Sequence, residues 1–188
     1  MRLTSVERKE LLRIARLAIW KHLQNEEFSV DKNRIQGNLF LRCGAFVTIR
    51  LNAQLRGCIG YVDSDHALAD TIAEIALKAA SQDPRFMPVT QDEFDNILIE
   101  ISVLSEIKEL SDYSQIEIGK HGLYLEGEHY RGLLLPQVAV ESKWDQLTFI
   151  KQLGRKAGIV DFNPDYPDVK IYTFTAEVFD ESNIDATE

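Results

Sequence analysis

The chain has 188 residues, of which 45% are hydrophobic and 27% are charged. A chain of this length buries roughly 70% of the surface that its unfolded form exposes, which excludes a disordered protein and favours one compact domain. The 30 acidic residues outnumber the 21 basic ones and give a net charge of −9. This charge argues against a nucleic-acid partner and an anionic membrane surface, because both are bound through clustered Lys and Arg.

The N-terminal segment and the cysteine content predict a cytoplasmic protein. Residues 1–10 are charged and lack the apolar core of a signal peptide. The longest apolar run, 133–135, is far shorter than the ~20 residues that cross a bilayer. Two cysteines, Cys43 and Cys58, are too few for a disulfide scaffold or a structural zinc site. We therefore expect no metal site and a reducing compartment.

The first predicted element is a long helix over residues 4–24. Thr4 and Glu7 have the spacing of a capping box, in which each side chain satisfies a free backbone N–H group of the other residue. The polar stretch 25–38 has no period and predicts a loop, which could be a mobile flap. The apolar residues that recur at helical spacing are Leu11, Leu12, Ala15, Ala18, Ile19 and Leu23.

A hairpin and a second helix follow. Strands over 45–49 and 55–61 flank Asn52-Ala53, a pair suited to a tight turn. The polar residues 63–65 predict an N-cap for a helix over 67–81. Asp83 ends that helix because a residue before proline is driven out of the helical region. Thr90 and Glu93 repeat the capping-box spacing and predict one further helical turn.

The second half predicts more strands and one helix. Alternating apolar residues predict a strand over 97–104, and a second hairpin covers 122–125 and 131–135, where Pro136 closes the strand. A helix over 145–156 ends at Gly158. Separate hairpins and helices predict an α+β fold with a mainly antiparallel sheet and flanking helices. A single C-terminal strand is predicted from the alternation of Tyr172, Phe174, Ala176 and Val178.

The two predicted hairpins resemble each other in sequence. Gly44-Ala45-Phe46-Val47 leads to Arg56-Gly57-Cys58-Ile59, and Gly122-Leu123-Tyr124-Leu125 leads to Arg131-Gly132-Leu133-Leu134. This similarity has two explanations, an internal duplication or the general physical likeness of short β-hairpins. In both cases Leu133 stands where the first hairpin has Cys58, so one copy alone carries a thiol.

Cys58 is the best candidate for a nucleophile. Side chains alternate along a strand, so Arg56, Cys58 and Gly60 share one face, and Gly60 leaves room for a substrate. Arg56 is about 6.6 Å away along the strand, near enough to stabilise a thiolate. The alternative is a buried cysteine that acts as a small hydrophobe. The expected core side chains on the other face are those of Leu55, Ile59 and Tyr61.

A disulfide between the two cysteines is not expected. The turn at residues 52–53 places Val47 opposite Cys58. Cys43 lies four residues beyond Val47, about 13 Å along the strand, which is too far for a bridge.

Other polar residues allow two interpretations each. His66 with Asp63 and Asp65 could bind a metal, but a capped turn explains them as well and is favoured. His121 is the best candidate for a base and is otherwise a polar residue at a strand end. Arg85 could hold an anion or simply pair with a carboxylate. Two further residues, either solvated or buried partners of Arg56 and Arg85, are Glu100 and Ser102.

Five segments, in this order and spacing between about Leu11 and Phe179, resemble the AMMECR-one domain family, also called protein A of the AmmeMemoRadiSam system. The segments are Leu55-Arg56-Gly57-Cys58-Ile59-Gly60, Asp83-Pro84-Arg85-Phe86, Ile99-Glu100-Ile101-Ser102-Val103-Leu104, Gly119-Lys120-His121-Gly122 and Arg131-Gly132-Leu133-Leu134-Leu135-Pro136-Gln137-Val138-Ala139.

The resemblance implies a single domain over residues 1–188 with two intertwined lobes and a cleft between them. It also implies neighbouring proteins, a Memo-type protein and a radical-SAM enzyme, but no reaction and no cofactor. Members of this family often have a cysteine where this chain has Gly154, which disfavours a mechanism with two thiols. The site residues implied by position are Arg56, Gly57, Cys58, Asp83, Arg85, His121, Arg131 and Gln137.

The leading hypothesis is a cytosolic cysteine-dependent enzyme, or a subunit of one. In it Cys58 is the nucleophile, Arg56 stabilises its thiolate and His121 carries a proton. Arg85 or Arg131 binds an anion of the substrate, with Gly57, Gly60, Asp83 and Gln137 beside it. The alternative is a module without catalysis that binds the partner proteins or a small molecule.

Overall fold

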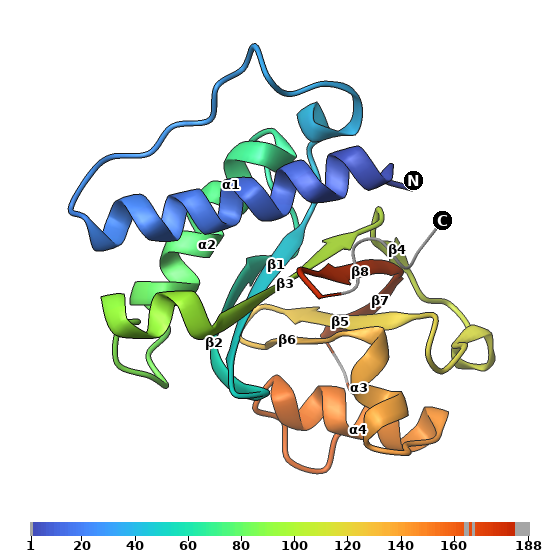
Figure 1. Cartoon of the computed structure of the whole chain (residues 1–188). Coiled ribbons are helices and arrows are strands. Elements are labelled where there is room, and N and C mark those ends of the chain that lie inside the picture. The colour runs from blue at the N-terminus through green and yellow to red at the C-terminus, as the bar shows by residue number, and fades with distance from the viewer. Residues whose placement is uncertain (1, 164–165, 167, 183–188) are drawn as a thin grey trace. The chain divides into compact units, whose positions relative to one another are not determined.

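The structure, a computed structural model, describes residues 2–163, 166 and 168–182. The chain divides into two compact units, Met1–Val103 with Glu177–Glu188 and Leu104–Ala176. Each unit contains a four-stranded sheet, and the neighbouring strands whose register is resolved run antiparallel. This confirms the α+β prediction (Figure 1).

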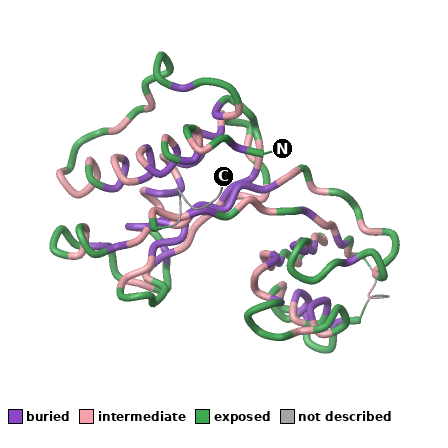
Figure 2. Tube along the Cα trace, turned by 45° about the vertical axis from the view of Figure 1, so that its right-hand side comes forward, coloured by how far each residue is buried: buried purple, intermediate pink, exposed green. Residues whose placement is uncertain are grey.

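The first unit packs two long helices on one face of its sheet. The inward side chains of β1, such as Val47 and Ile49, join the apolar stripe of α1 in one core. Thr4 and Glu7 form the predicted capping box. Figure 2 shows buried residues along the strands and the inner sides of the helices. The elements are α1 (Ser5–Leu23), η1 (Gly37–Phe40), β1 (Ala45–Leu51), β2 (Gln54–Tyr61), α2 (Leu68–Ser81), η2 (Gln91–Asn96), β3 (Ile97–Leu104) and β8 (Ala176–Asp180), with strand order β2-β1-β3-β8.

The second unit has a smaller core of the same design. Leu123 and Leu125 of β5 and Ile171 of β7 pack against Phe149 and Leu153 of α4. The elements are β4 (Lys108–Glu109), η3 (Tyr113–Gln115), β5 (Gly122–Gly127), β6 (Arg131–Leu134), α3 (Pro136–Glu141), α4 (Gln146–Lys156) and β7 (Val169–Phe174), with strand order β4-β7-β5-β6.

The connectivity of the two units repeats. In each unit a hairpin is followed by one or two helices and then by a strand that pairs with the first strand of the hairpin. The fourth strands are exchanged, because β4 follows β3 but joins the second sheet, while β8 follows β7 but joins the first. At these crossings the Ser105 N–H donates to the Thr175 carbonyl (2.8 Å), and the Thr175 N–H donates to Ser105 Oγ (2.9 Å).

Two predictions about elements are wrong, and one helix was not predicted. The predicted C-terminal strand is two strands in different sheets. The alternation of buried and exposed side chains does not continue across Thr175, and Phe174 and Phe179 are both buried. Residues 63–65 do not cap α2, whose N-cap is Ala67 without a side-chain bond; the Ser64 hydroxyl instead accepts from the His66 N–H. Pro136 begins the unpredicted helix α3, since proline at the first helical position loses no hydrogen bond.

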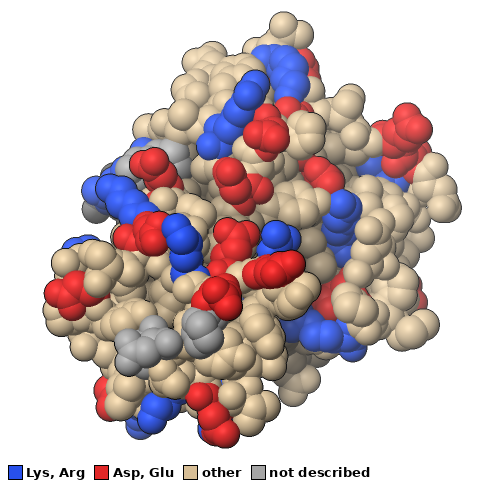
Figure 3. Space-filling view, turned by 180° about the vertical axis from the view of Figure 1, so that it is seen from behind, with Lys and Arg blue, Asp and Glu red and all other residues tan. Residues whose placement is uncertain are grey.

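Within the described residues, no helix is both long and apolar enough for a membrane crossing. On the face in Figure 3, side chains of both signs are interspersed.

Candidate functional site

A β-bulge in β2 determines which side chain lies opposite Cys58. The register pairs Arg50 with Leu55 but Ile49 with Gly57, so Arg56 is an extra residue in its strand. The prediction that Val47 lies opposite Cys58 is therefore wrong by one position, and the residue opposite Cys58 is Thr48. The same insertion turns the predicted core residue Leu55 outward, where it is 39% exposed.

Cys58 lies on the sheet face that points away from α2. Its half-buried thiol accepts a hydrogen bond from Thr48 Oγ1 at 3.3 Å. This contact makes the Thr48 hydroxyl a direct neighbour of the sulfur. The sequence analysis missed Thr48 because a hairpin without a bulge would turn it away from Cys58.

A buried carboxylate fixes the segment that follows α2 against Cys58. The Asp83 side chain is 2% exposed and accepts from the Cys58 backbone N–H at 2.8 Å. It also binds Arg85 through two parallel bonds, Nε to Oδ1 (2.9 Å) and Nη2 to Oδ2 (2.7 Å). The Arg85 guanidinium holds the pKa of Asp83 well below its usual range, although burial opposes this shift.

Arg85 is the guanidinium that lies beside Cys58. Its Nη2 is 3.4 Å from the Cys58 carbonyl oxygen. Asp83 makes the largest contribution to raising the pKa of Arg85, and the Cys58 side chain adds to it. The carboxylate that binds Arg85 is therefore that of Asp83, whereas the sequence left Glu100 and Ser102 open as its partners.

The hydrogen bonds of the Arg56 guanidinium go to residues other than Cys58. Its Nε and Nη2 bind the Glu93 carboxylate at 2.8 and 2.9 Å, and its remaining donors reach the carbonyl oxygens of Met87 and Pro88. Arg56 lowers the pKa of Glu93 to about 2, against the effect of burial. Arg56 therefore fastens the segment 87–93 to the bulge of β2.

The two glycines predicted to bind substrate have packing roles. A Cβ at Gly57 would lie 2.1 Å from the carbonyl oxygen of Ala79, so this glycine allows α2 to approach β2 closely. A Cβ at Gly60 would lie 2.2 Å from the Phe46 ring, which fills the space above this glycine.

The other predicted site residues lie in the second unit. His121 Nδ1 accepts from the Glu117 N–H at 3.1 Å. Arg131 is 75% exposed and lies 3.5 Å from Glu126. Gln137 belongs to α3, and its buried Oε1 has no partner among the residues that the structure describes.

Several other candidates lack the surroundings of Cys58. Burial and Asp63 raise the pKa of Cys43 to about 11, so this thiol is a poor nucleophile. Glu100 is 3.7 Å from Arg50, and the Ser102 hydroxyl is buried without a partner among the described residues. Within the same ranges, no group of three or more His, Cys, Asp or Glu side chains could hold a metal ion.

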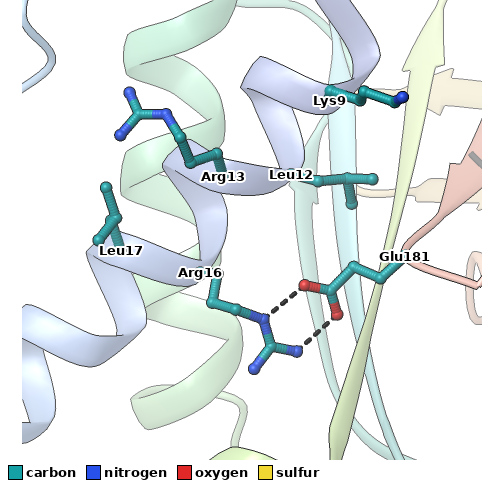
Figure 4. Close-up of a pocket in the computed structure, with 6 residues that line it drawn as sticks. All are labelled: Lys9, Leu12, Arg13, Arg16, Leu17 and Glu181. Atoms are coloured by element: carbon teal, nitrogen blue, oxygen red, sulfur yellow. Dashed lines mark hydrogen bonds and ion pairs between the residues drawn. The ribbon is translucent and has the colours of Figure 1, made fainter. Parts of the chain in front are cut away.

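Two surface hollows lie along α1 and do not include Cys58. One of about 340 Å³ is lined by α1 and Glu181, and another of about 590 Å³ lies between α1 and residues 34–39. In Figure 4, Arg16 and Glu181 form a doubly hydrogen-bonded pair, whereas Arg13 and Leu17 point away from it. Arg16 also donates to the carbonyl oxygens of Phe94 and Ile97, so its role is structural.

Comparisons with known proteins agree with the sequence motifs. The AMMECR1 family model matches residues 12–179. A protein of Methanothermobacter thermautotrophicus is 40% identical and covers 93% of this chain and 94% of its own length. Protein MK0488 of Methanopyrus kandleri is 39% identical, with 96% and 91% covered. The crystal structure of uncharacterized protein PH0010 from Pyrococcus horikoshii matches with a TM-score of 0.83 and 37% identity, covering 91% of this chain and 89% of that one.

Proposed function

The chain belongs to the AMMECR1 family, and from this premise we propose that it is a cytosolic cysteine-dependent enzyme whose nucleophile is Cys58. The observation that supports the proposal is the hydrogen bond of 3.3 Å from Thr48 Oγ1 to the sulfur, together with the adjacent Arg85 guanidinium. Hydrogen-bond donors and cations around a thiol favour the ionised, nucleophilic form.

In the proposed step the Cys58 sulfur attacks an electrophilic carbon of a small molecule. A sulfur–carbon bond forms, the leaving group departs with the electron pair of the broken bond, and the thiol proton passes to water. Arg85 takes the stabilising role first predicted for Arg56, whose donors bind Glu93 and two carbonyl groups. The roles predicted for His121, Arg131 and Gln137, which belong to the second unit, stay predictions.

Alkylation of the folded chain tests the nucleophile. Iodoacetamide at neutral pH should modify Cys58 well before Cys43, whose pKa of about 11 leaves little thiolate. Peptide mass spectrometry separates the two rates. Thr48→Val should slow the reaction at Cys58, and Ser29→Ala is a control that removes an exposed hydroxyl outside the site. A Cys58 that reacts no faster than Cys43 would remove the catalytic proposal.

Metabolite profiles of cells test whether the chain acts as an enzyme. Cells that carry Cys58→Ser in place of the wild-type chain should accumulate the substrate, and cells with Cys43→Ser should not. Matching profiles for wild type and Cys58→Ser would contradict catalysis. An adduct on Cys58 in the intact purified chain would identify the class of electrophile.

One observation favours a second candidate, a module without catalysis that binds the neighbouring proteins or a small molecule. Arg56 and Asp83 hold the segment 83–93 in place, and this segment carries Met87 with 81% exposure. A segment that is already held in place loses less conformational entropy when it binds a partner. Purified chain should then retain a Memo-type protein or a radical-SAM enzyme in a pull-down, with binding lost in Met87→Asp and kept in Cys58→Ser.

A further inference from the structure

We infer that Arg85 forms, beside Cys58, a binding site for the anionic group of the substrate, a carboxylate or a phosphate. The inference rests on the proposed function and adds the class of substrate: an electrophile whose reactive carbon lies within a few bonds of a negative charge.

The hydrogen bonds of Arg85 leave one part of its guanidinium open. Asp83 occupies Nε and Nη2, and Nη2 also approaches the Cys58 carbonyl oxygen. No described residue accepts a hydrogen bond from Nη1, which carries two N–H groups. The Arg85 side chain is 51% exposed, so solvent and small molecules can reach these donors.

Asp83 makes Arg85 a fixed donor. The carboxylate is buried and is held in turn by the Cys58 backbone N–H. The Arg85 backbone N–H also donates to Asp83 Oδ1 at 3.1 Å. A side chain that is already ordered loses less entropy on binding, so its contact with an anion is stronger. Asp83 therefore acts as a positioning residue that ties the anion site to the position of the thiol.

Two other arginines near this face are less suited to the task. Arg56 is 15% exposed, and all three of its guanidinium nitrogens donate to Glu93, Met87 and Pro88. Arg50 lies two residues from Thr48 and is close to Glu100. Arg50 therefore offers a matched control, because it has the same charge as Arg85 and lies on the strand face of Thr48, but no described hydrogen bond or ion pair joins it to Cys58 or Asp83.

Two alkylating reagents that differ in charge test the inference. Iodoacetate carries a carboxylate and iodoacetamide does not. In both reactions the sulfur forms a bond to the methylene carbon, iodide leaves with the bonding electrons and the thiol proton goes to the buffer. The ratio of the iodoacetate rate to the iodoacetamide rate at Cys58 should be about tenfold higher in the folded chain than in urea, given the strength of charged hydrogen bonds.

Variants show whether Arg85 causes the preference. Arg85→Gln should return the ratio to the value in urea, whereas Arg50→Gln should keep most of the preference. If both variants lower the ratio equally, general charge explains the effect and the inference is overturned. Should Arg85→Gln fail to fold because Asp83 loses its partner, the double variant Asp83→Asn with Arg85→Gln removes both charges together.

Protection of the wild-type chain provides a measurement without any substitution. Inorganic phosphate should slow the reaction of Cys58 with iodoacetamide several-fold at constant ionic strength, while the slow reaction at Cys43 is unchanged. If phosphate gives no protection and the reagent ratio is the same in the folded chain as in urea, the proposal of an anion site is overturned. Fast reaction of Cys58 with neutral iodoacetamide would still support the nucleophile, so the two proposals fail separately.

Discussion

The hairpins of the two units use one architecture with different side chains. β1–β2 and β5–β6 each carry Arg-Gly in the first half of the second strand, and each glycine faces the helix that covers its sheet. A Cβ would lie 2.1 Å from the Ala79 carbonyl oxygen at Gly57, and 2.8 Å from the Ala157 nitrogen at Gly132. The shared glycine therefore serves close packing of helix on strand in both units.

The residues around each glycine differ in chemistry. The first hairpin has the bulge that exposes Leu55 and places Cys58 opposite Thr48, whereas the register of β5–β6 is continuous and places Leu133 opposite Tyr124. Arg56 is 15% exposed, and each of its guanidinium nitrogens donates a hydrogen bond, but Arg131 is 75% exposed. The two hairpins thus share one backbone design, and the first one carries the candidate nucleophile and its hydroxyl neighbour. The second hairpin is therefore an internal control for these residues.

The largest expected effect comes from filling the glycine positions. Gly57→Ala should lower the free energy of unfolding of the first unit by about 3 kcal/mol, because a backbone atom of α2 blocks the new methyl group. Gly132→Ala should cost about 1–2 kcal/mol, since its contacts are longer. The two tryptophans report on one unit each, Trp20 on the first and Trp144 on the second.

Urea unfolding followed by fluorescence measures this contrast. Trp144→Phe leaves the signal of the first unit, and Trp20→Phe leaves that of the second. Equal losses for the two alanine variants would mean that the helices adjust equally well, and the packing comparison would fail.

Acid should weaken the first unit before the second. The pKa values of Asp83 and Glu93 are lowered in the folded chain, mainly by Arg85 and Arg56. As the pH falls below about 4.5, the unfolded chain takes up protons that the folded chain cannot, so stability present at higher pH is lost. We expect a loss on the order of 2 kcal/mol between pH 5 and 2.5.

The same tryptophan variants monitor the acid transition. Asp83→Asn with Glu93→Gln should flatten the pH dependence of the first unit. In the second unit the carboxyl groups with lowered pKa values, Asp112, Glu117 and Asp145, lie at the surface, where their pairings contribute little. A second unit that unfolds first on acidification would contradict this comparison.

The smallest effect on stability is expected from giving the second hairpin a thiol. Leu133→Cys should change the free energy of unfolding by about 1 kcal/mol or less, because Leu133 is only partly buried. Its iodoacetamide rate should stay below that of Cys58, since Tyr124 stands in place of Thr48. Equal rates would show that the hairpin geometry alone activates a thiol and that Thr48 and Arg85 are not needed.

Local patterns were sufficient to predict most elements. The capping boxes at Thr4 and Thr90, the helical stripe of α1 and the alternation of β3 each depend on side chains close in sequence. The predictions that failed depend on distant partners. Nothing near Thr175 indicates that the chain passes there from one sheet to the other, because that crossing is fixed by hydrogen bonds with Ser105.

The motifs pointed to four residues that lie together around Cys58, but not to Thr48 and not to the pairing of the charged groups. The motifs pointed to Arg56, Cys58, Asp83 and Arg85, and the first unit contains all four. The position of Arg56 depends on a bulge of one residue, and the carboxylates Asp83 and Glu93 lie 25 and 37 residues from their partners on β2. Neither feature has a local signature.

By itself the sequence determined the α+β class, the elements and the family, because periodicity, capping and motif spacing are written in neighbouring residues. Only the tertiary structure decided that Thr48 faces Cys58, that Arg85 is the adjacent cation and that Gly57 serves packing. The physical reason is that strand register and ion-pair choice are settled by competition among groups far apart in the chain, each taking the partner that leaves the fewest buried polar groups unsatisfied.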